Sequence, residues 1–377
     1  MIKWLQLTDE QRKISLEQAS LQSGINVKAI EKDWWVTLTL KALFQSAFAT
    51  QLVFKGGTSL SKCWKLIERF SEDIDIALDP EAFGMKYIEN PTKGHVERLK
   101  RKGCEFTSVA LKAELEKQFV DFGIANDTLY IEAERISENL PDKDPQTLHV
   151  AYRSLYDVNP YIADEVKIEG SVRSLKTPFT SRPVESILHE IFPNPAFAEI
   201  PFTVFTVEPR KTFLEKVFLL HEEFLKPDRS RIRSERMSRH LYDLGNMIGT
   251  EIEQSALTDH ALYDVLVKHR EWYSRISWVN YESLAPATIN FLPPEEMIET
   301  YRKDYKTMQD QMIYGETPDF DILLENLKIC KKKSGISNKI NYDPVAFKSK
   351  LSTPLPICAY SFALPISERH QLRLTSA

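Results

Sequence analysis

The spacing of apolar residues in the first fifty residues is typical of helices. Ile30, Trp34 and Leu38 recur at intervals that place them on one side of a helix. Thr8 is a residue type that caps helix N-termini, and Gly24 follows the first periodic run, where helices commonly end. We therefore expect helices within residues 8–48.

The next segment, residues 52–78, has the pattern of a strand, a turn, a helix and a second strand. The run LVFK (52–55) is rich in β-forming residues and stops at Gly56-Gly57. DIDIAL (73–78) alternates carboxylate and apolar residues, which indicates a strand with one polar face. Between them, apolar residues follow at i, i+3, i+4 and i+7, the spacing of an amphipathic helix: Leu60, Cys63, Trp64 and Ile67.

The rest of the chain predicts an α+β fold. Residues 93–122 have helical features, short strand-like runs dominate 128–172, and 177–209 are expected as loops with short strands. From Lys211 to about Cys330 the pattern is helical.

We therefore expect a mixed-sheet N-terminal domain over residues 1–205, which includes the helical segment 8–48. A mostly helical C-terminal domain would follow over residues 206–330. Residues 331–377 are rich in Ser, Pro and Lys, and we expect a loosely ordered extension there.

Composition narrows the class of protein. The net charge of −5 excludes a general polyanion binder, so that any nucleic-acid contact must come from a local basic patch. The four cysteines are scattered without a CxxC pair, which argues against a zinc site or a disulfide framework. No signal peptide and no apolar run of about 20 residues is present. We expect a soluble, cytoplasmic protein with no membrane partner.

Two carboxylates in DIDIAL are candidates for metal binding. Asp73 and Asp75 are two residues apart on a predicted strand, so that their side chains share one face. Two-metal phosphoryl transfer needs carboxylates fixed in this way. Glu169, in the alternating run VKIEG, is the best candidate for a third metal ligand from a neighbouring strand. A lone Asp-x-Asp is, however, common on solvated strands.

The Gly-Gly turn before this strand is a candidate triphosphate site. Gly56 and Gly57 permit close approach of the backbone to phosphate, and the following helix offers free N–H groups. Thr58 and Ser59 add hydroxyl donors, and Lys62 lies one turn further on. A lone Gly-Gly-Thr is usually only a turn, but the order of strand, Gly-Gly-Thr, helix and Asp-x-Asp strand favours nucleotide chemistry with Mg²⁺ or Mn²⁺.

The segment FKGGTSLSKCWKLIERFSEDIDIAL resembles the signature of the polymerase-β-like nucleotidyltransferase superfamily. More narrowly, the chain resembles the AbiEii/AbiGii toxin family, the nucleotidyltransferase half of bacterial toxin–antitoxin and phage-defence pairs. The runs EKDWWVTLTLKALF, FLEKVFLLHEEF and SRHLYDL are also similar to that family. The resemblance spans roughly residues 10–330.

The resemblance implies roles for particular residues. The Gly-Gly-Thr element would bind nucleotide phosphates together with Ser71, and Asp73 and Asp75 would hold Mg²⁺. The family's third motif carries a lysine, which Lys216 resembles, and its fourth motif carries an aspartate, which Asp243 resembles. The resemblance implies that both residues are catalytic. Arg69 and Phe70 match the pattern before the carboxylates. Lys62 departs from the family, which often has arginine there, and lysine lacks the bidentate fork.

Lys216 and Asp243 have some support from the sequence itself. Lys216 sits within an apolar helical stripe, where a buried lysine would be costly without a purpose. It could equally extend its ammonium to the surface. Asp243 lies among Leu241, Tyr242 and Leu244, and an exposed position on a helix is the alternative.

A run of arginines between residues 226 and 240 is the candidate contact to RNA. Such a concentration in an acidic chain favours a phosphate-rich partner, although a solvated charged loop explains it equally well. The residues are Arg229, Arg231, Arg233, Arg236 and Arg239.

Together these features predict a nucleotidyltransferase with its site in the cleft between the two domains. It would transfer NMP from an NTP to an acceptor hydroxyl, with RNA, such as the 3′ end of tRNA, as acceptor. The resemblance implies a toxin neutralised by a cognate antitoxin. The alternatives are a GTP- or ATP-binding sensor without transfer activity, and a protein that acts through its partner surface.

Overall fold

The computed structural model describes residues 1–125, 127–137, 140–159 and 162–337. The strands are β1 Leu52–Lys55, β2 Asp73–Leu78, β3 Leu129–Ala133, β4 Gln146–Tyr152, β5 Glu165–Ser171, β6 Phe179–Val184 and β7 Phe202–Val207. The α-helices are α1 Ile2–Leu5, α2 Asp9–Ser23, α3 Val27–Gln45, α4 Gly56–Lys62, α5 Lys93–Phe106, α6 Lys112–Asp121, α7 Ile187–Ile191, α8 Pro209–Phe224, α9 Ser238–Met247, α10 Glu251–Thr258, α11 His260–Tyr273, α12 Ile298–Gln311 and α13 Phe320–Ser337.

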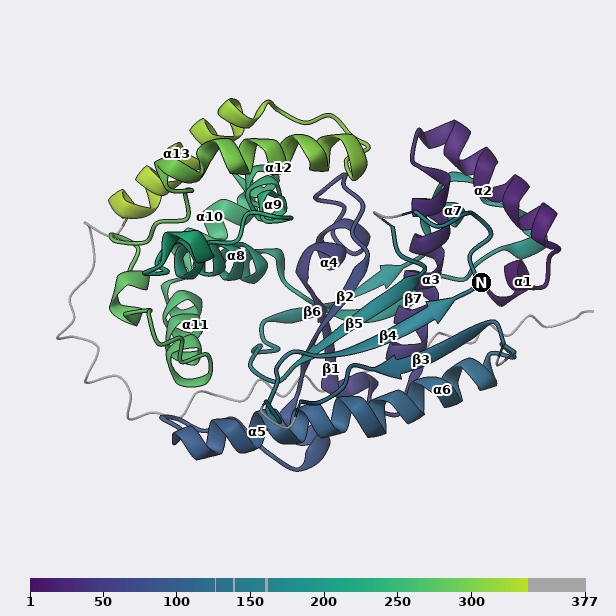
Figure 1. Ribbon diagram of the computed structural model, residues 1–377, viewed down its shortest axis with the longest axis horizontal. Helices are drawn as coiled ribbons and strands as arrows, with labels where there is room; N and C mark the ends of the chain where they lie inside the picture. Colours follow the sequence, from purple (N-terminus) through teal and green to yellow (C-terminus); the bar gives the residue numbers. More distant parts are fainter. Residues whose placement is uncertain (126, 138–139, 160–161, 338–377) are drawn as a thin grey trace, which may run out of the picture. The chain divides into compact units, whose positions relative to one another are not determined.

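The strands form one seven-stranded mixed sheet in the order β3-β4-β5-β2-β1-β7-β6 (Figure 1). β2 pairs in antiparallel with β1 and in parallel with β5, so that β2 lies in the interior of the sheet. The predicted α+β class is confirmed. The predicted strands at 52–55 and 73–78 have the bounds of β1 and β2.

The two faces of the sheet differ in character. Ile74, Ile76 and Ile168 are almost fully buried in the core on one face. Helices α3, α5 and α6 contact the strands, and α5 and α6 run along the lower side of the sheet in Figure 1. Because side chains alternate along a strand, Asp73 and Asp75 point to the opposite face.

Helix α2 begins and ends at the expected residues, and α3 lies within the expected helical range 8–48. Thr8 accepts a hydrogen bond from the Gln11 backbone N–H at 3.2 Å, and Gly24 has a left-handed φ of 73° at the end of α2. In α3, the buried Asp33 carboxylate pairs with Lys62 at 2.6 Å, and Lys32 pairs with Glu72 at 2.5 Å. These pairs fix α4 and the residue before Asp73 against α3.

The segment after α4 departs from prediction. The helix begins at Gly56 and ends at Lys62, and Lys65 has a positive φ of 52°. Residues 64–72 then run without regular structure, although Ile67 and Phe70 are buried as expected. The expected helix is wrong beyond Lys62 because the apolar spacing reported which residues are buried and not their backbone conformation.

The helical part of the chain comprises α8 to α13, from teal-green to yellow in Figure 1. It belongs with the sheet to one compact unit, Met1–Ser337, and the boundary at residue 205 stays a prediction. Helix α13 includes residues 331–337 of the expected extension, and residues 338–377 lie outside the described residues. None of the described helices is long and apolar enough to cross a membrane.

Candidate active site

A cavity of about 670 Å³ lies against the polar face of the sheet. Its floor comprises the ends of β1, β2 and β5, and its walls come from α8, α11 and the segment that leads into α9. Such a volume is within the usual range for a small-molecule site. The cavity therefore lies where sheet and helical part meet, as the sequence predicted for the active site.

The three candidate metal-binding carboxylates line this cavity together. Asp75 is the register partner of Glu169 on β5, and Asp73 lies on the same face of β2. Burial, followed by the charges of Glu72 and Asp75, raises the pKa of Asp73. Burial, followed by Asp75 and Asp73, raises the pKa of Glu169. The carboxylates thus repel one another in a place that lacks full hydration.

Two charged residues that the sequence did not indicate also line the cavity, Lys55 in its floor and Glu215 in its wall. Lys55 is the register partner of Asp75 on β1 and lines the cavity. Burial alone would lower the pKa of Lys55, but Glu215, Asp75 and Glu169 outweigh it and raise the pKa. Burial disfavours ionisation of Glu215, yet Lys211 and Lys55 lower its pKa to about 2. Lys55 remains a cation and Glu215 an anion at neutral pH.

The two glycines fit closely against the charged residues. Gly56 has a φ of 77°, and a Cβ there would overlap the Asp75 carboxylate. A Cβ on Gly57 would overlap the Arg69 guanidinium and touch Ser71 Oγ at 3.2 Å. Both glycines line the cavity. Their lack of side chains is what lets Asp75 and Arg69 approach the turn.

The other residues predicted to bind nucleotide divide into two groups. Ser71 lines the cavity, and its Oγ lies 2.8 Å from Thr58 Oγ1. Thr58 also donates to the Asp73 carbonyl at 2.5 Å, and Ser59 donates to the Gly56 carbonyl at 2.9 Å. Thr58, Ser59 and Lys62 are buried and do not line the cavity. This arrangement favours a role in holding the turn rather than in contact with a ligand.

Asp243 joins two cations at the edge of the cavity. Its carboxylate accepts from Arg69 Nε at 2.7 Å and Nη2 at 2.8 Å, and Lys216 Nζ lies 2.8 Å away. Burial opposes ionisation of Asp243, but Arg69 and Lys216 hold its pKa well below the usual range. Arg69 and Lys216 line the cavity, whereas Asp243 is fully buried behind them. Asp243 therefore acts on the cavity by positioning the two cations.

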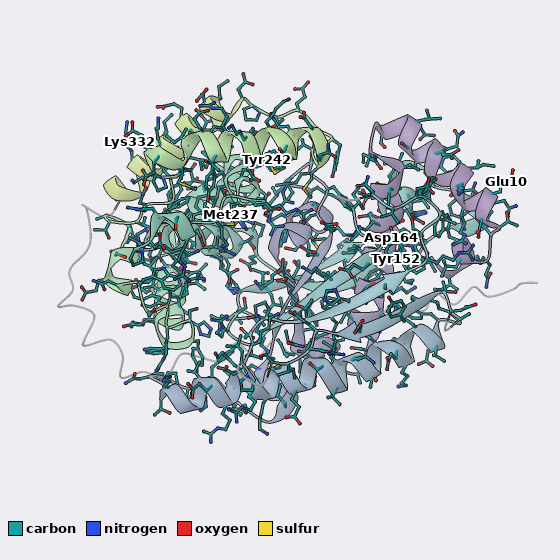
Figure 2. All side chains as sticks on the ribbon, in the orientation of Figure 1. Glu10, Tyr152, Asp164, Met237, Tyr242 and Lys332 are labelled. Carbon is teal, nitrogen blue, oxygen red and sulfur yellow. The ribbon has the colours of Figure 1, made fainter. Side chains whose placement is uncertain are left out.

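His240 adjoins this cluster and stays neutral. Its Nδ1 lies 3.4 Å from Lys216 Nζ. Burial, followed by the charges of Lys216 and Arg239, puts the pKa of His240 well below its ordinary value. The same side of the cavity carries Met237, labelled in Figure 2.

The five arginines of the predicted RNA contact do not lie together. Arg233 and Arg239 line the cavity, and Arg239 Nη1 is 4.0 Å from the Asp73 carboxylate. Arg236 pairs with Glu72 at 3.2 Å, and Arg229 donates to the Phe224 carbonyl at 2.8 Å. Arg231 is exposed outside the cavity.

Three cavity residues had little or no signal in the sequence. Arg69 appeared only as part of a motif, although it proves to be a buried cation over the Gly-Gly turn. Lys55 was visible only as the last residue of a strand. Arg270 lies about 200 residues from that strand, and only the fold brings the two to one cavity.

The donor set suits a hard divalent cation. Among the described residues, no group of three or more His, Cys, Asp or Glu side chains is placed so that it could hold a metal ion as the side chains stand. Mg²⁺ is usually bound by one or two protein carboxylates together with substrate phosphates and water, so that it does not need such a group. Asp73 and Asp75 on one strand face fit this mode, and Glu169 as a third ligand stays a prediction.

A carboxylate pair on a mixed sheet, facing a Gly-Gly turn and buried cations, agrees with the class of nucleotidyl transferases. Residues 39–326 match the family model described as nucleotidyl transferase AbiEii toxin, type IV toxin–antitoxin system. The chain belongs to this family, which confirms the resemblance, and a cognate antitoxin is implied. No curated protein matches the chain.

Proposed function

We propose that this protein transfers NMP from an NTP to an acceptor hydroxyl of RNA, such as the 3′ end of tRNA. The observation that carries the proposal is the set of Asp73, Asp75 and Glu169 on the cavity floor beside the Gly-Gly turn. The acceptor oxygen would attack the α-phosphorus, and the bond from that phosphorus to the bridging oxygen would break. Pyrophosphate would leave with that oxygen.

In this proposal Asp73 and Asp75 hold Mg²⁺ or Mn²⁺. The bound ion would neutralise the triphosphate and lower the pKa of the attacking hydroxyl. The backbone at Gly56 and Gly57, with Ser71 Oγ, would contact the phosphates. Glu169, the register partner of Asp75, would be the third ligand of this ion, and the proton of the attacking hydroxyl would pass to water in the cavity.

The buried cations Lys216 and Arg69 would stabilise charge during the reaction. Lys216 and Arg69 reach the cavity from the pair with Asp243 and would stabilise negative charge on the α-phosphate and the leaving pyrophosphate. Because Asp243 fixes both, little reorganisation is needed during the reaction. Thr58, Ser59 and Lys62 would support the turn from behind.

Arginines at the cavity would position the RNA. Arg233 is exposed and lines the cavity together with Arg239. Contacts from these side chains to RNA phosphates would set the register without reading sequence. Arg229, Arg231 and Arg236, which lie outside the cavity, would be less important for the acceptor.

The proposed setting is the bacterial cytoplasm, with a role in phage defence. The sensor and partner-surface alternatives remain distinct hypotheses. Expression of the wild type, Asp73→Ala and the exposed control Asp121→Ala in bacteria separates them. Growth arrest by the wild type and control, but not by a folded Asp73→Ala, supports transfer. Arrest by all three would refute the catalytic account and favour the partner surface.

A further inference from the structure

One side of α8 lines the cavity over several turns, and its residues change from charged to partly apolar along the helix. Glu215 and Lys216 line the cavity, where Glu215 interacts electrostatically with Lys55 of the floor, and Leu219 and Glu222 line it further along the helix. At 1.5 Å rise per residue, Glu222 is about 10 Å from Glu215 along the helix axis. The far end of this cavity-lining side therefore lies about two helical turns from Glu215.

The far end carries an apolar shelf. Leu219, Ile276 and Trp278 line the cavity and are partly or largely exposed. Trp278 is 42 % exposed, and its Nε1 donates to the Glu222 carbonyl at 3.1 Å. A tryptophan that is fixed by one edge offers a flat surface for stacking at low entropic cost.

A polar pair lies beside this shelf. Arg270 donates to the buried Glu222 carboxylate through Nε at 2.8 Å and through Nη2. Its guanidinium lies 5.8 Å from the Phe218 ring centroid. Within the described part of the chain, Nη1 of Arg270 makes none of these contacts, although Arg270 lines the cavity. A fixed donor is thus available for an acceptor atom on a planar ligand.

From this juxtaposition we infer that Trp278, Leu219, Ile276 and Arg270 form a nucleobase-binding subsite. Trp278 supplies a stacking surface, and Arg270 donates to an acceptor atom on the base edge, which every base possesses. The inference rests on the proposed function, because the base belongs to a nucleotide at the carboxylate end. Two nucleotides have this chemistry: the incoming NTP and the terminal nucleotide of the acceptor.

The subsite is tested by isothermal titration calorimetry, which compares ligand binding to the wild type and to Trp278→Ala. The ligands are each Mg²⁺-NTP without acceptor, tripolyphosphate, and a single-stranded RNA trinucleotide with a free 3′ hydroxyl. Trp278→Phe keeps an aromatic ring, and Trp272→Phe, on α11 but outside the cavity lining, is the matched control. Because Trp278 is exposed, the variants should fold, which circular dichroism verifies.

Loss of stacking should weaken base binding about 5- to 150-fold in Trp278→Ala. Weaker NTP binding with unchanged tripolyphosphate binding assigns the subsite to the incoming nucleotide, and weaker RNA binding alone assigns it to the acceptor. Trp278→Phe should retain most of the affinity, and Trp272→Phe all of it. If neither NTP nor RNA binds more weakly to Trp278→Ala, the inference is wrong.

The test separates this inference from the proposed function. Equilibrium binding needs no turnover. If the wild type transfers no label but its NTP or RNA affinity still depends on Trp278, the transfer proposal fails and the subsite stands. If transfer occurs but Trp278→Ala binds every ligand normally, the subsite alone fails.

Discussion

Asp73 lies at a position that disfavours its negative charge. Burial raises its pKa first, with Glu72 and Asp75 adding to the effect. A carboxyl whose pKa is raised by folding binds more protons in the folded chain, so that its contribution to the free energy of unfolding decreases as the pH rises through that range. A bound cation would relieve this cost.

Asp73→Asn should therefore stabilise the protein without metal and remove most of its response to Mg²⁺. We expect a Tm higher than the wild type by about 2 °C in EDTA, the shift that roughly 1 kcal/mol gives in a large domain. Mg²⁺ should raise the Tm of the wild type and of Asp121→Asn much more than that of Asp73→Asn. Differential scanning fluorimetry measures both. An equal response in all three proteins would contradict metal binding at Asp73.

At the scale of elements, the Gly-Gly turn and the segment before β2 fit together. The Arg69 guanidinium occupies the space next to Gly57 that a side chain would fill. The Asp243 carboxylate holds that guanidinium in place, so that it has little freedom to move aside. The turn is thus shaped around a buried cation.

Gly57→Ala should displace Arg69, with a loss of about 1–3 kcal/mol in the free energy of unfolding and of most activity. The matched control is Gly94→Ala in α5, where a Cβ meets nothing within 4 Å. That change should be neutral or slightly stabilising, because alanine favours helix more than glycine. Urea unfolding distinguishes the two. Equal stability of Gly57→Ala and the wild type would show that Arg69 is not held against the turn.

Strand β2 and the segment after Lys62 show which structural features could be predicted from the spacing of apolar residues and which could not. Period-two alternation placed Asp73 and Asp75 on one strand face because burial of Ile74 and Ile76 requires that register. Helical spacing of apolar residues, in contrast, gave a wrong prediction beyond Lys62. There the side chains are buried by contacts with the helical part of the chain, which is distant in sequence. There the Phe70 N–H donates to the Met312 carbonyl at 2.7 Å.

Long-range pairing also decided which site residues the sequence missed. Only the folded chain brings Lys55 within electrostatic range of Glu215 and lets Arg270 donate to the Glu222 carboxylate. Lys62, predicted for phosphate, instead meets the buried Asp33. No local spacing reveals such partners, because each pair joins elements that are far apart in sequence.

At the scale of the molecule, Asp243 links the sheet to the helical part. Arg69 precedes β2, Lys216 lies on α8, and Asp243 lies on α9. The Tyr242 hydroxyl, labelled in Figure 2, accepts from the Glu68 backbone N–H at 3.3 Å next to this cluster. The buried Asp243 carboxylate therefore holds the segment before β2 against helices α8 and α9.

Asp243→Asn should reduce the free energy of unfolding by about 3–5 kcal/mol, since two buried cations lose their counter-charge. Asp259→Asn, in a partly exposed pair with Arg210, should cost about 1 kcal/mol or less. Chemical denaturation with matched m-values provides the comparison. Similar losses in the two variants would contradict the central position of Asp243.

Buried histidines should make the whole protein sensitive to mild acid. Burial is the main cause that lowers the pKa of His269 to about 4. The unfolded chain binds this proton near pH 6.5, so that stability falls as the pH drops from about 6.5 to 4, by up to about 3 kcal/mol for His269. His269→Gln should flatten the dependence of the unfolding free energy on pH in this window. An unchanged slope would refute the assignment.

The central claim is nucleotidyl transfer at Asp73 and Asp75, and labelling tests it most directly. The purified protein would be incubated with Mg²⁺, total bacterial RNA and each α-³²P-labelled NTP in turn, beside Asp73→Ala and Asp121→Ala. We predict label in small RNA with the wild type and Asp121→Ala, and none with Asp73→Ala. Absence of label from every NTP, while nucleotide still binds, would contradict the claim.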